Sequence, residues 1–130
     1  MTDSSPLVRT DFSSDEGWRE AVRQATAESE DGFRAELEPI DDRAFEGQGP
    51  EALAANDRWK GKAVLFVVDG QTIEDCECSI ACVDLVDQPG RSFRAIPSAL
   101  WGVENNLRLA NMDFDEFASA AGQGGPFRGF

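Results

Sequence analysis

The chain has 130 residues, 41% of them hydrophobic, and includes nine Phe and three Trp. This length and apolar content suit one domain, residues 1–130, with a single core, and they exclude wholesale disorder. The 25 Asp and Glu outweigh 12 Lys and Arg, and the resulting formal charge of -13 repels nucleic acid and anionic lipid surfaces.

Several further classes are excluded by what the sequence lacks. Residues 1–12 have no apolar stretch of signal-peptide length, and the longest apolar run, residues 63–68, is too short to span a bilayer. Three Cys without a regular pattern suit a reducing compartment, so we expect a cytoplasmic protein. Because there is no His, nucleophile pairs that depend on imidazole are absent.

The first part of the chain predicts a strand and then a helix. Residues 7–10 are expected to form the strand. Ser13 and Glu16 have the spacing of a capping box, so the helix is expected to begin there. The residues that recur at helical spacing and should face the core are Trp18, Ala21, Val22 and Ala25.

The next segment predicts a second strand and a short helix. Phe33, Ala35 and Leu37 alternate with charged residues, which indicates a strand with one buried face. Pro39 should end this strand or place it at the edge of a sheet. Residues 50–56 begin with Pro and predict a short helix, whose end Asn56 would cap.

The middle of the chain predicts a central strand and a hairpin. Residues 63–68 are apolar and rich in β-branched side chains, as in a strand covered on both faces, and Asp69-Gly70 is expected to end it in a turn. Residues 80–86 and 92–96 should form a hairpin around residues 87–90.

Two registers are open for this hairpin. A tip of Pro89-Gly90 alone puts Asp84 opposite Ala95 and Arg94 on the other face of the sheet. A tip that includes Gln88 puts Asp84 opposite Arg94. Because Pro-Gly fits the centre of a type II turn, we favour the first.

The last quarter predicts two helices. Leu100, Val103, Leu107 and Ala110 form one stripe, and Asn111 should supply a left-handed cap. Asp113 then starts a helix with Phe114, Phe117 and Ala121 facing the core. In the glycine-rich tail, residues 122–130, we expect Phe127 and Phe130 to pack back onto the domain; the alternative is a tail that docks on another chain. The whole order predicts an α/β (α+β) fold, a mixed sheet of about five strands with three or four packed helices.

Four segments carry a family resemblance. They are residues 9–12, residues 83–94 (VDLVDQPGRSFR), residues 100–117 (LWGVENNLRLANMDFDEF) and the terminal residues 127–130. Together they resemble an uncharacterised family of small acidic actinobacterial proteins, over nearly the whole chain. Since that family is a domain of unknown function, the resemblance implies no catalytic residues.

The cysteines form the pattern Cys76-x-Cys78-x3-Cys82, and thiolates at such spacing can share a metal ion. The pattern is one ligand short, and the neighbouring carboxylates raise thiol pKa values. We therefore predict ordinary reduced thiols, with no metal and no cofactor.

Two carboxylates are candidates for a binding or catalytic site. Asp69 follows a central strand, where open α/β sheets bind ligands, and Asp84 interrupts an apolar strand. Two such groups on neighbouring strands would bind Mg²⁺ or act as acid and base. A strand-ending Asp-Gly is more often simply a turn. Arg94 joins these candidates because of its place in the hairpin.

Trp101, Glu104, Asn105 and Arg108 lie off the apolar stripe of their helix, so they are expected on its polar side. Glu104 and Arg108 have the spacing of an ion pair. Trp101 and Asn105, also four apart, have the composition of a contact patch. The alternative for Trp101 is a ring lying flat over the edge of the core.

These observations favour a non-enzymatic protein-protein interaction module, since the residues of common catalytic centres are missing. High acidity favours a basic protein as its partner, although acidity also serves solubility alone. The alternative is a small-molecule or divalent-metal-dependent enzyme that uses strand-end carboxylates. The candidate contact residues are Asp69, Asp84, Arg94, Trp101 and Asn105.

Overall fold

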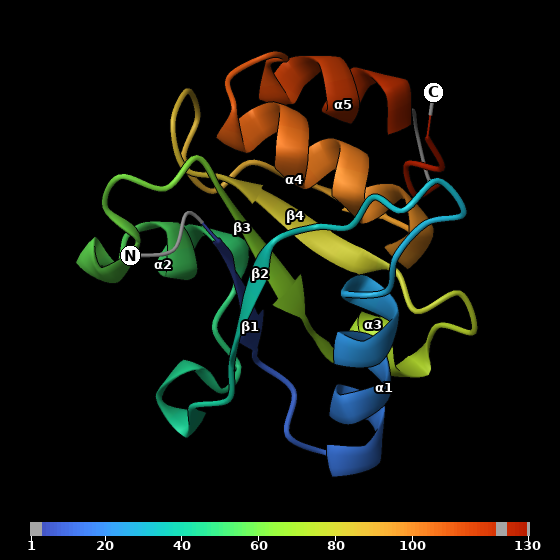
Figure 1. Ribbon diagram of the computed structural model, residues 1–130. Coiled ribbons are helices and arrows are strands. Elements are labelled where there is room, and N and C mark those ends of the chain that lie inside the picture. The colour runs from blue at the N-terminus through green and yellow to red at the C-terminus, as the bar shows by residue number, and fades with distance from the viewer. Residues whose placement is uncertain (1–3, 122–124, 130) are drawn as a thin grey trace.

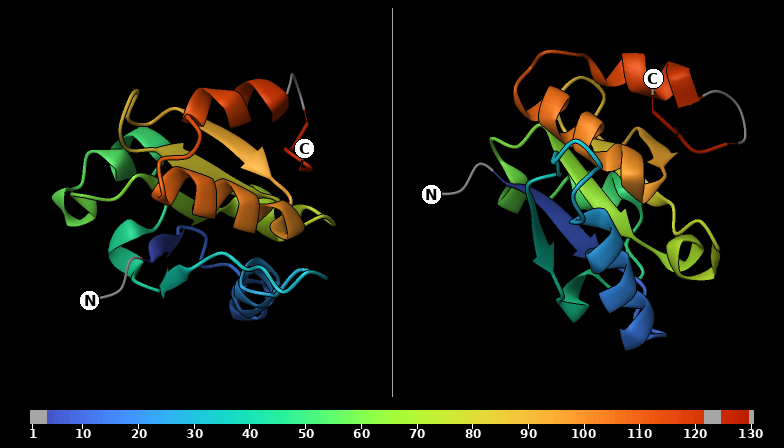
Figure 2. Two further views of the ribbon diagram at one scale, coloured as in Figure 1. Left: turned by 45° about the horizontal axis from the view of Figure 1, so that its top comes forward. Right: turned by 45° about the vertical axis from the view of Figure 1, so that its right-hand side comes forward.

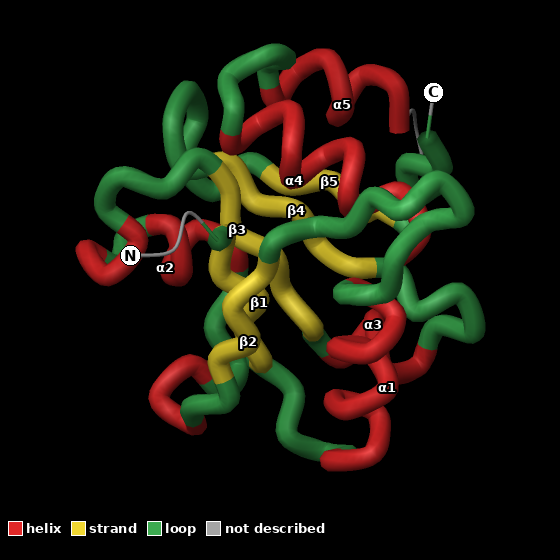
Figure 3. The backbone as a smooth tube through the Cα atoms, viewed as in Figure 1, coloured by secondary structure: helices red, strands yellow, loops and turns green. Residues whose placement is uncertain are grey.

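A five-stranded mixed sheet forms the centre of the computed structural model, which describes residues 4–121 and 125–129. Figure 3 shows the strands together in the centre with helices around them. The two strands beside β1 run parallel to it, whereas β3, β4 and β5 are successively antiparallel. The predicted mixed sheet and α/β class are confirmed. The spatial order is β2 (Leu37–Ile40), β1 (Ser5–Arg9), β3 (Val64–Val68), β4 (Ile80–Asp84) and β5 (Ser92–Ala95).

Helices cover both faces of this sheet because strand residues alternate between two apolar clusters. In β3, for example, Phe66 enters the larger cluster and Leu65 the smaller one. The larger cluster lies under α1 (Asp15–Ala25), α4 (Leu100–Arg108) and α5 (Phe114–Ala121), which appear in Figure 1. The smaller lies under η1 (Arg43–Phe45), α2 (Pro50–Ala54) and η2 (Asp57–Trp59).

Helix α1 buries the predicted face but begins one residue later than the expected cap. The Ser14 hydroxyl accepts the Gly17 N–H at 2.9 Å, so Ser14 is the N-cap. The predicted box of Ser13 and Glu16 is wrong, because the Ser13 hydroxyl donates to Asp11 instead. The buried residues are Trp18, Ala21 and Ala25, with Val22 packed beside them.

Strand β2 begins at Leu37, four residues later than predicted. Ala35 is buried, as the alternation predicted, but 52% of Phe33 is exposed. Pro39 lies within β2, at the edge of the sheet, which confirms one of its two predicted placements. The long loop between α1 and β2 runs beside α4, where Phe33 finds a partner described below.

Two short elements differ from prediction. Asp69 does not simply end β3: its side chain accepts the Thr72 N–H at 3.0 Å and caps a helix, α3 (Gly70–Glu74), that was not predicted. Asn56 does not end α2 but begins η2, since its side chain accepts the Arg58 N–H.

The C-terminal part follows the prediction except at one cap. After η3 (Pro97–Ala99), the stripe residues Leu100, Val103 and Leu107 are buried. Ala110 is exposed and has a φ of 58°, so it takes the left-handed position predicted for Asn111.

Residues 125–129 lie beside β5 (Figure 2). Phe127 is 3% exposed and forms an isolated β-bridge with Ala95 of β5. The predicted packing of Phe127 onto the domain is therefore confirmed. Phe130 lies outside the described residues. No helix in the described part of the chain has the length and apolar content to cross a membrane.

Candidate functional site

The two candidate carboxylates do not meet. Strands β3 and β4 are antiparallel and pair Val64 with Asp84, whereas Asp69 follows the other end of β3. At about 3.3 Å per residue, roughly 16 Å of strand separates them. A cation or substrate group cannot bridge this span. The predicted joint carboxylate site is therefore wrong, because the direction of the hairpin reverses the ends of its strands.

Asp84 organises the loop of the hairpin. It is 2% exposed, and its carboxylate accepts the N–H groups of Val86 and Gln88, each at 2.9 Å. Its own N–H donates to the Arg91 carbonyl, which closes a loop over residues 85–90. Asp84 thus supports the structure of the loop.

The hairpin has neither of the two predicted registers, because its loop is longer than the loop that either register requires. Ile80 pairs with Ala95 and Ala81 with Arg94. Residues paired across two strands share a face, and Asp84 is three residues from Ala81. Asp84 and Arg94 therefore lie on opposite faces, as predicted, although through a different register.

Arg94 pairs instead with Asp69, across the width of β4. Its guanidinium donates to both Asp69 oxygens, at 2.9 and 3.0 Å, in the bidentate geometry that fixes orientation. It also donates to the Thr72 hydroxyl and to the hydroxyl and carbonyl of Ser79. The described partners occupy both charged groups, so this cluster joins α3 to the sheet rather than presenting a reactive carboxylate.

The pKa of Asp69 reflects this pairing. Burial raises the pKa, but hydrogen bonds and the positive charge of Arg94, together with the bonds from Thr72, outweigh burial. The net effect lowers the pKa of Asp69 below its ordinary value. The carboxylate is therefore ionised at neutral pH and unsuited to act as a general acid.

Acid unfolding tests this pair. Because folding lowers its pKa, the contribution of Asp69 to stability is present above its ordinary value of 3.8 and is lost as the pH falls through the lowered value. Arg94→Met should lower the free energy of unfolding at pH 7 by about 2 kcal/mol, less than for a fully buried pair because both groups are partly exposed. It should also flatten the loss of stability between about pH 4 and pH 2, measured by urea unfolding.

Arg34→Met, at an exposed pair with Glu36, is the control. Equal pH dependence in Arg94→Met and the native protein would contradict this assignment.

Arg9 lies at the end of β1, beside the end of β3 that Asp69 follows. It was not among the candidates predicted from the sequence. It is 3% exposed at the end of β1, and its guanidinium bonds to Asp15 at 2.7 Å and Asp41 at 3.3 Å. The guanidinium also lies 4.4 Å from the centre of the Phe12 ring. An Arg that ends a buried strand, followed closely by acidic residues, was the signal available. Arg9 thus neutralises Asp15, at the start of α1, and Asp41, which follows β2.

The three cysteines are free thiols. Cys76 is exposed, whereas Cys78 and Cys82 are buried, and burial raises the pKa of both buried thiols. No group of three or more Cys, Asp or Glu side chains is arranged to hold a metal ion within residues 4–121 and 125–129. The raised pKa values leave the buried sulfurs weak as nucleophiles and ligands.

Trp101 and Asn105 lie together, and both contact the loop before β2. The Trp101 ring stacks on Phe33, with centroids 4.9 Å apart and planes inclined by 15°. The Asn105 amide donates to the Trp101 carbonyl at 2.7 Å and to the Arg34 carbonyl at 3.1 Å. The sequence singled out Trp101 and Asn105 but assigned Phe33 to a buried strand face.

Glu104, on the same helix, does not lie where the sequence predicts it. The predicted ion pair with Arg108 exists, at 2.8 Å, but Glu104 is fully buried rather than on the polar side of α4. Its carboxylate also accepts the Ser5 hydroxyl at 2.8 Å and the Glu36 N–H at 2.9 Å. These bonds connect α4 to β1 and to the residue before β2, so they hold the loop that carries Phe33.

A cleft of about 350 Å³ begins at Trp101. Trp101 and Gly102 of α4, Phe117 of α5 and Phe127 beside β5 are among its lining residues. Trp101 thus both stacks on the exposed ring of Phe33 and lines this cleft. An aromatic pair with one exposed ring, beside a cleft, provides a surface for contact.

Comparison with curated proteins finds no match. The family models give one: residues 4–130 match the model described as Domain of unknown function (DUF6924). This match spans all the strands and helices described above. The chain therefore belongs to the DUF6924 family.

Proposed function

We propose that this protein is a non-enzymatic interaction module and that it binds a basic protein through an acidic aromatic patch. The patch consists of the stacked rings of Phe33 and Trp101 and the acidic residues of the preceding turn, Glu28, Glu30 and Asp31. The observation that carries the proposal is the Phe33–Trp101 stack, in which 52% of Phe33 is exposed.

The aromatic pair is held in place before any partner arrives. Asn105 bonds the Arg34 carbonyl, and the buried Glu104 bonds the Glu36 N–H, so the chain after Phe33 is fixed at two points. The Ser29 hydroxyl accepts the Phe33 N–H at 3.1 Å. A rigid aromatic anchor loses little conformational entropy on binding, and this favours affinity.

The negative charge of the patch favours a basic partner. Glu28, Glu30 and Asp31 are exposed in the turn that precedes Phe33, and the chain carries -13 overall. Such a field speeds encounter with a positive surface and opposes nucleic acid. A basic protein with an apolar side chain able to lie on Phe33 is the partner that fits. Three free thiols suit a reducing compartment, and we place this function in the cytoplasm.

Affinity capture tests the proposal. The immobilised protein should retain a basic protein from a lysate of the source cells at low salt, and moderate salt should weaken retention as charges are screened. Phe33→Ser should weaken binding of the purified partner at least about tenfold, as expected for loss of an aromatic anchor. Calorimetry measures this affinity.

Val86→Ser is the matched control, because Val86 is likewise apolar and exposed, at 63%, in the hairpin loop. It should leave the affinity unchanged. Equal weakening in both variants, or capture of acidic proteins only, would contradict the proposal. Circular dichroism of each variant establishes that the fold is retained.

A further inference from the structure

The basic residues of this acidic chain are distributed unevenly. Within residues 4–121 and 125–129, the Lys and Arg that form no ion pair with a carboxylate are Arg19, Arg58, Lys60 and Lys62. Three of these lie between positions 58 and 62, and both lysines of the chain are among them. Unpaired positive charge therefore gathers at η2 and the turn that leads into β3.

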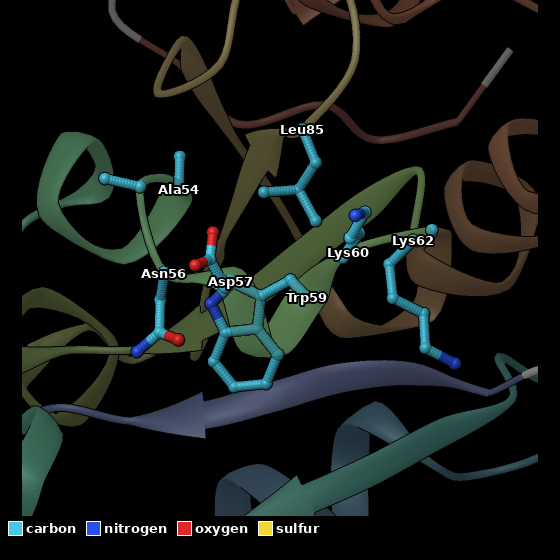
Figure 4. Close-up of a pocket in the computed structure, with 9 residues that line it drawn as sticks. Ala54, Asn56, Asp57, Trp59, Lys60, Lys62 and Leu85 are labelled. Carbon is cyan, nitrogen blue, oxygen red and sulfur yellow. The ribbon is translucent and has the colours of Figure 1, made fainter.

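A hollow of about 540 Å³ lies beside these cations. Figure 4 shows Lys60 and Lys62 on one side of it and Ala54 on the other, with Leu85 above and the Trp59 indole below. The indole N–H donates to the Leu53 carbonyl at 2.9 Å, which fixes the ring. The Lys62 ammonium donates to the Ser4 carbonyl at 2.6 Å, so this side chain lies at the margin of the hollow with its ammonium directed toward Ser4 (Figure 4).

We propose that this hollow binds a small ligand that carries an oxyanion, a carboxylate or phosphate, on an apolar body. Lys60 would contact the oxyanion, since its ammonium has no carboxylate partner among the described residues, and Lys62 would add positive charge at the margin. Leu85 and Ala54 offer apolar contact for the rest of the ligand. Few precisely placed charges with apolar walls are typical of small-molecule sites.

The overall charge of -13 does not prevent this binding. At physiological ionic strength, exposed charges more than about 8 Å apart are largely screened, so the nearest groups decide the local potential. Among the residues that line the hollow, these are Lys60 and Lys62 against Asp57. Arg58 is adjacent in the chain, and its guanidinium lies 5.4 Å from the centre of the Trp59 ring.

Titration of the isotope-labelled protein with phenyl phosphate, benzoate and inorganic phosphate tests the site by NMR. We expect saturable shifts of the Gly61 and Lys62 amides and of the Trp59 indole N–H. Lys60→Gln should weaken binding about tenfold, as expected for loss of one close charge, and Lys62→Gln should weaken it less, because the Lys62 ammonium is held by the Ser4 carbonyl. Arg19→Gln is the matched control, because Arg19 is an unpaired cation on α1, outside the residues that line the hollow. It should leave binding unchanged.

The three probes separate the possible ligands. Tighter binding of phenyl phosphate identifies a phosphate ester, and tighter binding of benzoate identifies a carboxylate. Inorganic phosphate binding as tightly as phenyl phosphate would overturn the role of the apolar walls. Shifts that do not saturate, or an equal loss in Arg19→Gln and Lys60→Gln, would overturn the site. Lys60 is exposed, so its substitution preserves the fold.

Discussion

Glu104→Ala is expected to lower the free energy of unfolding by about 3 kcal/mol. The substitution leaves the Arg108 guanidinium without its carboxylate and the Ser5 hydroxyl and Glu36 N–H without their acceptor. Buried donors that lose a charged acceptor pay their full cost of desolvation. Urea unfolding at neutral pH measures the change.

Glu20→Ala is the control for Glu104→Ala. Glu20 also lies on a helix and pairs with an Arg, but this pair is exposed. The cost should be much smaller than for Glu104→Ala, because water screens exposed pairs. If the two variants lost equal stability, the buried carboxylate would not be the connection between α4 and the strands that its contacts indicate.

Phe127→Ala is the second substitution with a large expected effect. It should lower the free energy of unfolding by about 3 kcal/mol. The Phe127 ring packs edge-on against Phe117, with centroids 5.3 Å apart, and against Phe93 at 6.4 Å. Alanine would leave a cavity between α5 and β5 that rigid neighbours cannot fill. Thermal and urea unfolding should both register the loss.

Val86→Ala provides the comparison for Phe127→Ala. Val86 is 63% exposed, and its truncation should cost less than about 0.5 kcal/mol. A native melting temperature in Phe127→Ala would contradict the docking of the C-terminal segment onto the core. The alternative, a tail available to another chain, would then gain support.

The fold was largely predictable because strands with strong local patterns form where they are expected. β3, with its unbroken apolar run, lies at the centre of the sheet. The weaker alternation from Phe33 misled, since stacking on Trp101 draws Phe33 out of the strand. Helix α3 was missed although Asp69 and Thr72 have the spacing of a cap.

The polar clusters were less predictable because they depend on pairings between distant segments. Asp69 and Arg94 meet only because of the β4–β5 register, and the loop held by Asp84 sets that register. Glu104 breaks the expected polar face of α4 because two of its partners come from other segments. They are the Ser5 hydroxyl, at the start of β1, and the Glu36 N–H, just before β2. Sequence periodicity identifies buried faces but does not reveal which polar groups meet inside them.

Both outer strands of the sheet are closed to further strand addition. In β2, Pro39 has no N–H to offer a neighbouring strand. Beside β5, Phe127 already donates its N–H to the Arg94 carbonyl and accepts the Ile96 N–H. These devices prevent edge-to-edge aggregation in a protein whose sheet is largely apolar. They also favour contact through the side chains of the surface over extension of the sheet by another chain.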